Sequence, residues 1–126
     1  GACIVNQNKR IVGIGYNGLP IGCNDDEYPW EREGELLNTK YPYVVHAEPN
    51  AILNSTSSLV NATLYVTLYP CNECMKLIIQ SGIKEIVYLS DKYNGTPTDI
   101  ASKKMAASAN IKTRQLKDYK LTVTHQ

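Results

Sequence analysis

The sequence predicts an α/β fold in which helices cover one central sheet. Two observations favour this fold class: β-branched segments alternate with helical segments along the chain, and the joins between them are short after residue 44. The chain has 126 residues, the usual size of one domain, so we expect residues 1–126 to form a single domain.

The first third of the chain predicts a hairpin followed by a long loop. Gly1–Val5 and Arg10–Gly15 are rich in β-branched and small residues, and turn-forming residues separate them, which favours an antiparallel pair. Residues 17–40 contain repeated Gly, Pro, Asn and Asp, and we expect them to form a loop. Loops of this length in compact domains are usually functional or disordered.

The rest of the chain predicts regular elements. In chain order they are a helix His46–Leu53, a strand Thr63–Tyr69, a helix Cys71–Gln80, a strand Lys84–Ser90, a helix Asp99–Ala109 and strands Ile111–Leu116 and Leu121–Thr124. Pro49 falls in the first turn of its helix, where a missing backbone donor costs little. Gly82 is expected to end the second helix.

Composition excludes several classes of protein. Apolar residues make up 43% of the chain, which excludes a wholly disordered protein, and the net charge of +1 disfavours a polynucleotide-binding protein. No apolar run approaches the roughly 20 residues of a membrane span, and no signal peptide opens the chain. We therefore expect a cytoplasmic protein that binds neither a polynucleotide nor a membrane.

Two short motifs carry candidate chemistry: His46-Ala47-Glu48, and Pro70-Cys71-Asn72-Glu73-Cys74. Residues three apart share a helix face, so Cys71 and Cys74 are expected to point the same way near a helix N-terminus, where thiolates are stabilised. Four cysteines could instead form two disulfides in a secreted protein, but the spacing of Cys71 and Cys74 favours metal binding. Alone, a Cys-x-x-Cys pair also occurs in redox sites and structural zinc sites.

Together the two motifs predict a catalytic zinc site. His46, Cys71 and Cys74 supply three ligands, and catalytic zinc has three protein ligands and an open position for water. Glu48 lies two residues past His46, where its carboxylate is expected to face that water and transfer its proton. His-x-Glu with Pro-Cys-x-x-Cys is a known signature of zinc nucleobase deaminases.

On these motifs the chain resembles the cytidine and deoxycytidylate deaminase superfamily, and within it the deoxycytidylate (dCMP) deaminases. The resemblance extends over roughly residues 1–115. Its further matches are Gly15–Pro20, Gly22–Asp26, Pro29–Trp30, Thr39–Tyr43, Lys76–Lys84 and Ser90–Tyr93.

The resemblance implies a three-layer α/β sandwich with a mixed five-stranded sheet. It implies hydrolysis of dCMP to dUMP and ammonia, which supplies dUMP for dTMP synthesis, by a zinc-activated water with Glu48 as proton shuttle. Asn17, Ala47 and Tyr93 are then expected to contact the substrate. Lys92, Lys40, Arg32 and the backbone amides around Gly18 and Gly22 are candidate donors to its phosphate. The alternative for each is a solvated surface group.

The resemblance also implies a homo-oligomer, often a hexamer, that dCTP activates and dTTP inhibits. We expect the effector to bind the long loop, at Gly18, Gly22, Asp25 and Asp26. Members of the family usually carry an apolar residue where this chain has Pro49. Their fold begins with a helix before the strand at Gly1, so that helix is expected to be missing here and the chain to be truncated at its N-terminus.

Two alternatives remain open at the level of the sequence. The zinc motifs alone also fit a deaminase acting on free cytosine, cytidine, tRNA adenosine or single-stranded DNA. A non-catalytic binding module stabilised by zinc is the other alternative, although a structural zinc site gains nothing from Glu48.

Overall fold

The computed structural model describes residues 1–117. Its centre is a five-stranded mixed sheet with the strand order β2-β1-β3-β4-β5. The strands are β1 (Ala2–Val5), β2 (Ile11–Gly15), β3 (Thr63–Leu68), β4 (Glu85–Ser90) and β5 (Lys112–Gln115). β1 pairs antiparallel with both β2 and β3, whereas β3, β4 and β5 run parallel. The predicted mixed five-stranded sheet is confirmed.

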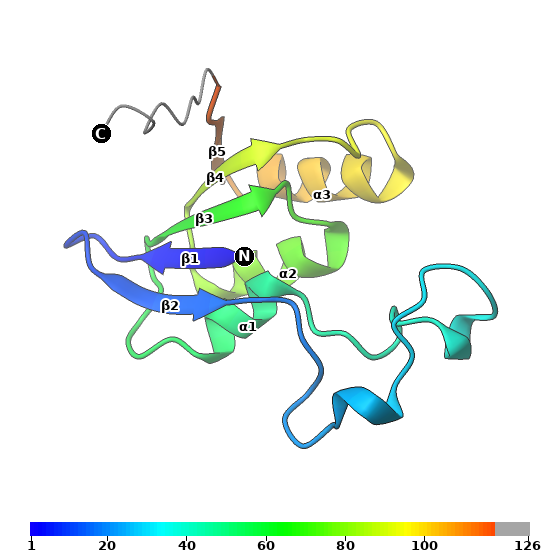
Figure 1. Cartoon of the computed structure of the whole chain (residues 1–126). Helices are drawn as coiled ribbons and strands as arrows, with labels where there is room; N and C mark the ends of the chain where they lie inside the picture. The colour runs from blue at the N-terminus through cyan, green and yellow to red at the C-terminus, as the bar shows by residue number, and fades with distance from the viewer. Residues whose placement is uncertain (118–126) are drawn as a thin grey trace, which may run out of the picture.

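Three helices connect the strands: α1 (Ala47–Leu53), α2 (Asn72–Ser81) and α3 (Pro97–Ser108). Figure 1 shows them behind the sheet, with their first turns at the edge where β2, β3 and β4 end and β1 begins. The hydrophobic core lies between this layer and the sheet, and its fully buried side chains include Ile4, Leu64, Met75, Ile78 and Ile86. None of the described helices is long and apolar enough to cross a membrane.

The element boundaries differ slightly from those predicted. α3 begins at Pro97 rather than Asp99, because the Thr96 side chain accepts a bond from the Asp99 amide and Pro97 occupies the first turn. α2 ends at Gly82, as predicted, in a left-handed conformation with φ of 93°. The predicted strand Leu121–Thr124 lies outside the described residues.

The long loop contains two short 3₁₀ turns that the sequence did not predict, Asp25–Glu27 and Leu36–Asn38. The Asn24 side chain caps the first turn by accepting a bond from the Asp26 amide at 2.9 Å. The loop extends from the end of β2 beyond the sheet (Figure 1) and returns through a two-way backbone pairing of Gly18 with Val45.

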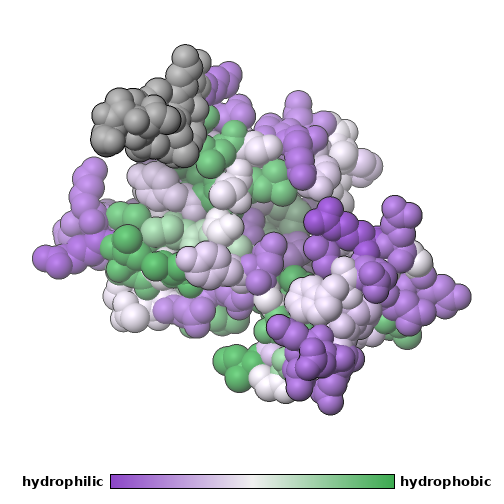
Figure 2. Space-filling model, in the orientation of Figure 1, coloured by the Kyte–Doolittle hydropathy of each residue, from purple (hydrophilic) through white to green (hydrophobic). Residues whose placement is uncertain are grey.

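The other face of the sheet carries no helix within residues 1–117, so the described part of the sandwich has two layers. Ile14, Cys3, Tyr65 and Val87 follow one another in register across this face, from β2 to β4. Ile14 is 47% exposed and Tyr65 is 40% exposed. Figure 2 shows hydrophobic side chains gathered over β1 and β2.

Candidate metal centre and cleft

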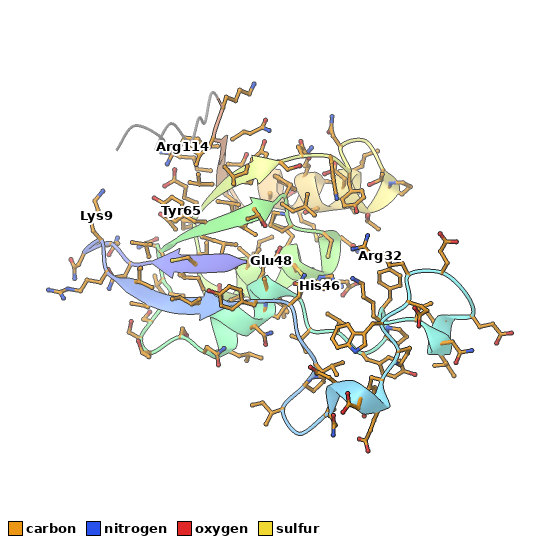
Figure 3. The ribbon with its side chains drawn as sticks, in the orientation of Figure 1. Lys9, Arg32, His46, Glu48, Tyr65 and Arg114 are labelled. Atoms are coloured by element: carbon orange, nitrogen blue, oxygen red, sulfur yellow. The ribbon has the colours of Figure 1, made fainter. Side chains whose placement is uncertain are left out.

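The two predicted motifs meet at one edge of the sheet. β3 leads into Pro70 and Cys71, and His46 begins α1 beside them. His46 and Glu48 lie close together at the start of α1 (Figure 3). In α/β folds ligands bind outside the carboxyl ends of the parallel strands, and the motifs lie at that edge.

Asn17 holds the start of α1 in place. The Asn17 Oδ1 atom accepts a hydrogen bond from the Ala47 amide at 2.9 Å. His46 is the N-cap residue of α1, and its own side chain makes no capping bond, so Asn17 supplies the acceptor that the first turn needs. The imidazole of His46 is therefore free to face α2.

Two glycines of β2 let α1 lie directly on the sheet. A Cβ atom on Gly15 would come within 2.3 Å of the Ala47 carbonyl oxygen and the Ala51 amide nitrogen. A Cβ atom on Gly13 would come within 2.5 Å of the Ala51 carbonyl oxygen. These are backbone atoms, so no side-chain rotation could relieve the clash. The distance between β2 and α1 therefore depends on both glycines. The position of His46 depends on them too, because His46 is the N-cap residue of α1.

α2 is held at its start by a residue of α3. Cys71 is the N-cap of α2, and its carbonyl accepts from the Met75 amide at 2.8 Å. The preceding carbonyl, of Pro70, accepts from the buried Ser102 hydroxyl at 2.8 Å. This bond ties the strand-to-helix turn that carries Cys71 to α3.

The predicted ligands form a cluster that fits zinc. The ligand atoms of His46, Cys71 and Cys74 all lie within 4.8 Å of one another. His46 Nδ1 is 3.2 Å from Cys74 Sγ and 3.9 Å from Cys71 Sγ. Ligand atoms around a tetrahedral zinc are about 3.5–3.8 Å apart, given Zn–S near 2.3 Å and Zn–N near 2.0 Å. One nitrogen and two sulfurs also match the ligands that zinc prefers.

The two thiols differ in their acidity. The pKa of Cys71 is lowered to about 3, because its thiolate accepts hydrogen bonds from Cys74 and His46 and from backbone amides of α2. The pKa of Cys74 is raised, because its thiol bonds to the Cys71 thiolate and because it is buried. One thiolate and one thiol thus share the cluster, and a divalent cation would stabilise both as thiolates. Cys3, Cys23, Cys71 and Cys74 are all free in the structure.

Glu48 is buried against this cluster. It is 8% exposed, and His46, Cys71 and Cys74 all influence the pKa of its carboxyl group. Burial is the main reason that the pKa of Glu48 is raised. A buried carboxyl next to three metal-ligand atoms is placed to accept and return protons.

A cleft of about 510 Å³ opens above the cluster. It lies within the usual size range of small-molecule sites. His46, Ala47, Glu48 and Cys71 line it, whereas the more deeply buried Cys74 does not. Its other walls include Asn17, Lys40, Tyr41, Tyr69, Tyr93, Thr96 and Asp99.

The residues predicted for the effector lie elsewhere. Gly18, Gly22, Asp25 and Asp26 do not line the cleft, and Asp25 and Asp26 are exposed in the first 3₁₀ turn. Gly22, which precedes the first 3₁₀ turn, has a φ of 92°. Asn17, Ala47 and Tyr93 therefore line the same cleft as His46 and Cys71, whereas the four effector candidates lie outside it.

Sequence reasoning missed three residues that position the site: Gly13, Gly15 and Ser102. The two glycines alternate with Val12 and Ile14 in a strand, and a glycine inside a strand is a signal of close backbone approach. The sequence does not say which element approaches. Ser102 carries no local signal, because its partner is the carbonyl of Pro70, 32 residues earlier.

Comparison with known proteins shows which family has this arrangement. The family model of the cytidine and deoxycytidylate deaminase zinc-binding region matches residues 1–90. The chain is 54% identical to human deoxycytidylate deaminase over 117 residues, and 51% identical to a probable deoxycytidylate deaminase of Drosophila melanogaster over 131 residues. These alignments cover 91% and 98% of the chain, but 66% and 64% of the relatives, so the chain spans about two thirds of their length.

A solved structure has the same fold. The dCMP deaminase of cyanophage S-TIM5, in complex with dCMP and dUMP, superimposes with a TM-score of 0.70 at 28% identity. The superposition covers 91% of this chain and 79% of the phage protein. With the zinc-ligand cluster, these matches show that the chain belongs to the cytidine and deoxycytidylate deaminase family.

Proposed function

We propose that the protein hydrolyses dCMP to dUMP and ammonia and so supplies dUMP for dTMP synthesis. The observation that carries this proposal is the buried Glu48 carboxyl beside the His46–Cys71–Cys74 cluster, on the wall of a nucleotide-sized cleft. Curated relatives named deoxycytidylate deaminase, at up to 54% identity, support dCMP as the substrate.

In this proposal Glu48 moves the protons. Zinc, when bound by His46, Cys71 and Cys74, supplies the Lewis acid that activates water. Glu48 accepts a proton from the attacking water and delivers it to N3 of the cytosine ring. It then transfers the second proton to the departing amino nitrogen, so that the C4–N bond breaks as ammonia leaves and C4 becomes a carbonyl.

Three residues would orient the substrate. The Oδ1 atom of Asn17 is taken by the Ala47 amide, which leaves the Asn17 NH₂ group available as a donor at the cleft. The backbone of Ala47 lies between the metal ligand and Glu48. Tyr93 also lines the cleft and is 55% exposed, so its ring is accessible to a nucleotide.

Lys40 is the proposed ligand of the substrate phosphate. Of the three cations considered from the sequence, only Lys40 lines the cleft. Among the described residues, no other Lys or Arg lines it. Its backbone is fixed, because its amide donates to the Glu31 carbonyl and its carbonyl accepts from the Tyr43 and Val44 amides. Lys92 and Arg32 are exposed and lie outside the cleft lining.

We predict that Lys40→Met raises KM for dCMP about 10-fold or more, because a charge-assisted contact to phosphate is lost. KM for deoxycytidine, which has no phosphate, should change less than about twofold. Lys9→Met is the matched control, since Lys9 lies at the far end of the sheet (Figure 3). A larger effect from Lys92→Met than from Lys40→Met would contradict the assignment.

The effector and assembly proposals follow the family. We propose activation by dCTP and inhibition by dTTP through the loop that holds Gly18, Gly22, Asp25 and Asp26. We also propose a homo-oligomer, with a hexamer as one form, in the cytoplasm. The free state of all four cysteines is consistent with a reducing compartment.

The decisive experiment measures ammonia release by the zinc-loaded protein from dCMP, CMP, deoxycytidine and cytosine, each with and without dCTP. Turnover of dCMP above the other substrates, raised by dCTP, is the expected result. Preferred turnover of cytosine or cytidine would assign another deaminase specificity. No turnover despite one zinc per chain would support a non-catalytic module and contradict the proposal.

A further inference from the structure

α3 carries a lysine whose ammonium group contacts three side chains. Lys103 Nζ is 2.7 Å from Asn94 Oδ1, 2.8 Å from Asp91 Oδ2 and 3.1 Å from Asp99 Oδ2. Asp99 is only 5% exposed. Lys103 itself does not line the cleft, so it is outside the machinery described above.

Two of these contacts are to the loop that carries Tyr93. The loop, residues 91–96, joins β4 to α3, and Asp91 and Asn94 are its anchors on Lys103. Within the loop the Thr96 hydroxyl donates to the Tyr93 carbonyl at 2.8 Å. The Gly95 amide donates to Asp99 Oδ2 at 2.9 Å, the same oxygen that faces Lys103. The backbone of Tyr93 is thus linked to α3 on both sides.

Lys103 also contacts the second tyrosine of the cleft. Its Nζ lies 5.0 Å from the centre of the Tyr69 ring, within the range of a cation–π interaction. Tyr69 is 8% exposed and packs edge-on against Tyr88, with ring centres 4.9 Å apart. One ammonium group therefore contacts both the Tyr69 ring and the loop that carries Tyr93, and both tyrosines line the cleft.

We propose that Lys103 is a positioning residue for the substrate: its ammonium group holds the 91–96 loop and the Tyr69 ring, and so presents Tyr93 and Tyr69 to the nucleotide. This proposal rests on the proposed deaminase function. It predicts that Lys103 contributes to substrate binding without touching the reacting atoms.

The charges explain why an ammonium group is needed there. Asp91 and Asp99 both face Lys103, and Asp91 Oδ1 is buried without a hydrogen-bond partner among residues 1–117. Without the cation, two carboxylates would face each other across the join of loop and helix, and like charges at short range repel. The 91–96 loop would then lose its fixed conformation. Substrate binding would have to order the loop again, which weakens the affinity for the substrate.

The test compares Lys103→Met with Lys103→Arg, and uses Lys104→Met as the control. Lys104 is the exposed neighbour on the same helix. For Lys103→Met we expect KM for dCMP to rise about 10-fold while kcat falls less than about threefold, with the Kd for dUMP by calorimetry rising in step with KM. Lys103→Arg keeps the charge and should recover most of the affinity, and Lys104→Met should match the wild type. Zinc content should be unchanged in all three.

A milder variant covers the case in which Lys103→Met does not fold. Asn94→Ala removes one contact of Lys103 at an exposed position, and it should raise KM about threefold with zinc content and the unfolding midpoint unchanged. Unchanged KM and Kd in the folded variants, or equal losses of kcat and zinc, would overturn the proposal. These outcomes are measured against an active wild type, so they differ from failure of the proposed function, in which the wild type itself would not release ammonia from dCMP.

Discussion

Replacing Glu48 by Gln is expected to lower kcat for dCMP by about 10⁴-fold, at the upper end of what a general acid–base residue contributes. Gln keeps the size and the hydrogen-bonding capacity of the side chain, but it can neither accept the proton of the attacking water nor return it. Glu48 is buried in the cleft wall beside Cys74. Because Gln has nearly the same size, the substitution should leave the fold unchanged. Ammonia release under saturating dCMP measures the effect.

Zinc content is the companion measurement for Glu48→Gln. The three ligands are unchanged, so about one zinc per chain should remain. Glu73→Gln is the matched control: Glu73 lies in the first turn of α2, exposed, in an ion pair with Lys76 at 2.9 Å. It should retain wild-type turnover, because an exposed ion pair contributes little. Turnover by Glu48→Gln within tenfold of the wild type would contradict the proton-shuttle role.

The second large effect concerns stability. Gly15→Ala places a Cβ atom 2.3 Å from two backbone atoms of α1, so α1 must move away from β2. Overpacking usually lowers the free energy of unfolding by about 1–3 kcal/mol. A clash with two backbone atoms, which cannot rotate away, belongs at the upper end of this range or beyond. We expect the unfolding midpoint to fall by about 10 °C or more. Zinc affinity should fall too, because α1 carries His46.

Gly18→Ala is the control for stability, since a Cβ atom there would meet nothing within 4 Å. Thermal unfolding with and without zinc, together with a zinc titration, compares the two variants. We expect the midpoint and zinc affinity of Gly18→Ala to stay near the wild type. If Gly15→Ala bound zinc as tightly as Gly18→Ala, the close approach of β2 would not set the position of His46.

The chemistry-bearing residues could be predicted because their signals are local. His46, Glu48, Cys71 and Cys74 lie at the starts of two helices, and each spacing by itself determines which side chains share a face. The structure confirms that the three ligands meet. Pro49 was predicted to be tolerated, and it occupies the first turn of α1, where its missing N–H has no partner to lose.

Other features depend on which distant segments meet. In the sequence Gly15 is only a weak strand residue, and the structure shows that α1 packs directly against it. Ser102 is an ordinary helix residue in the sequence, and the structure shows that its hydroxyl bonds the Pro70 carbonyl. Lys40, Lys92 and Arg32 have the same charge, and only the fold of the long loop places Lys40 alone at the cleft.

The sequence by itself therefore determined the mixed α/β class and the set of side chains, His46, Cys71 and Cys74, that the structure brings together. It also pointed to Glu48 as the proposed proton-transferring residue. Helix spacing and strand patterning act over a few residues, so these features can be read along the chain. Only the tertiary structure decided how closely α1 approaches the sheet, which lysine lines the cleft, and that Lys103 contacts the 91–96 loop. Close packing decides these features, because contacts between residues far apart in the chain leave no periodic signal in the sequence.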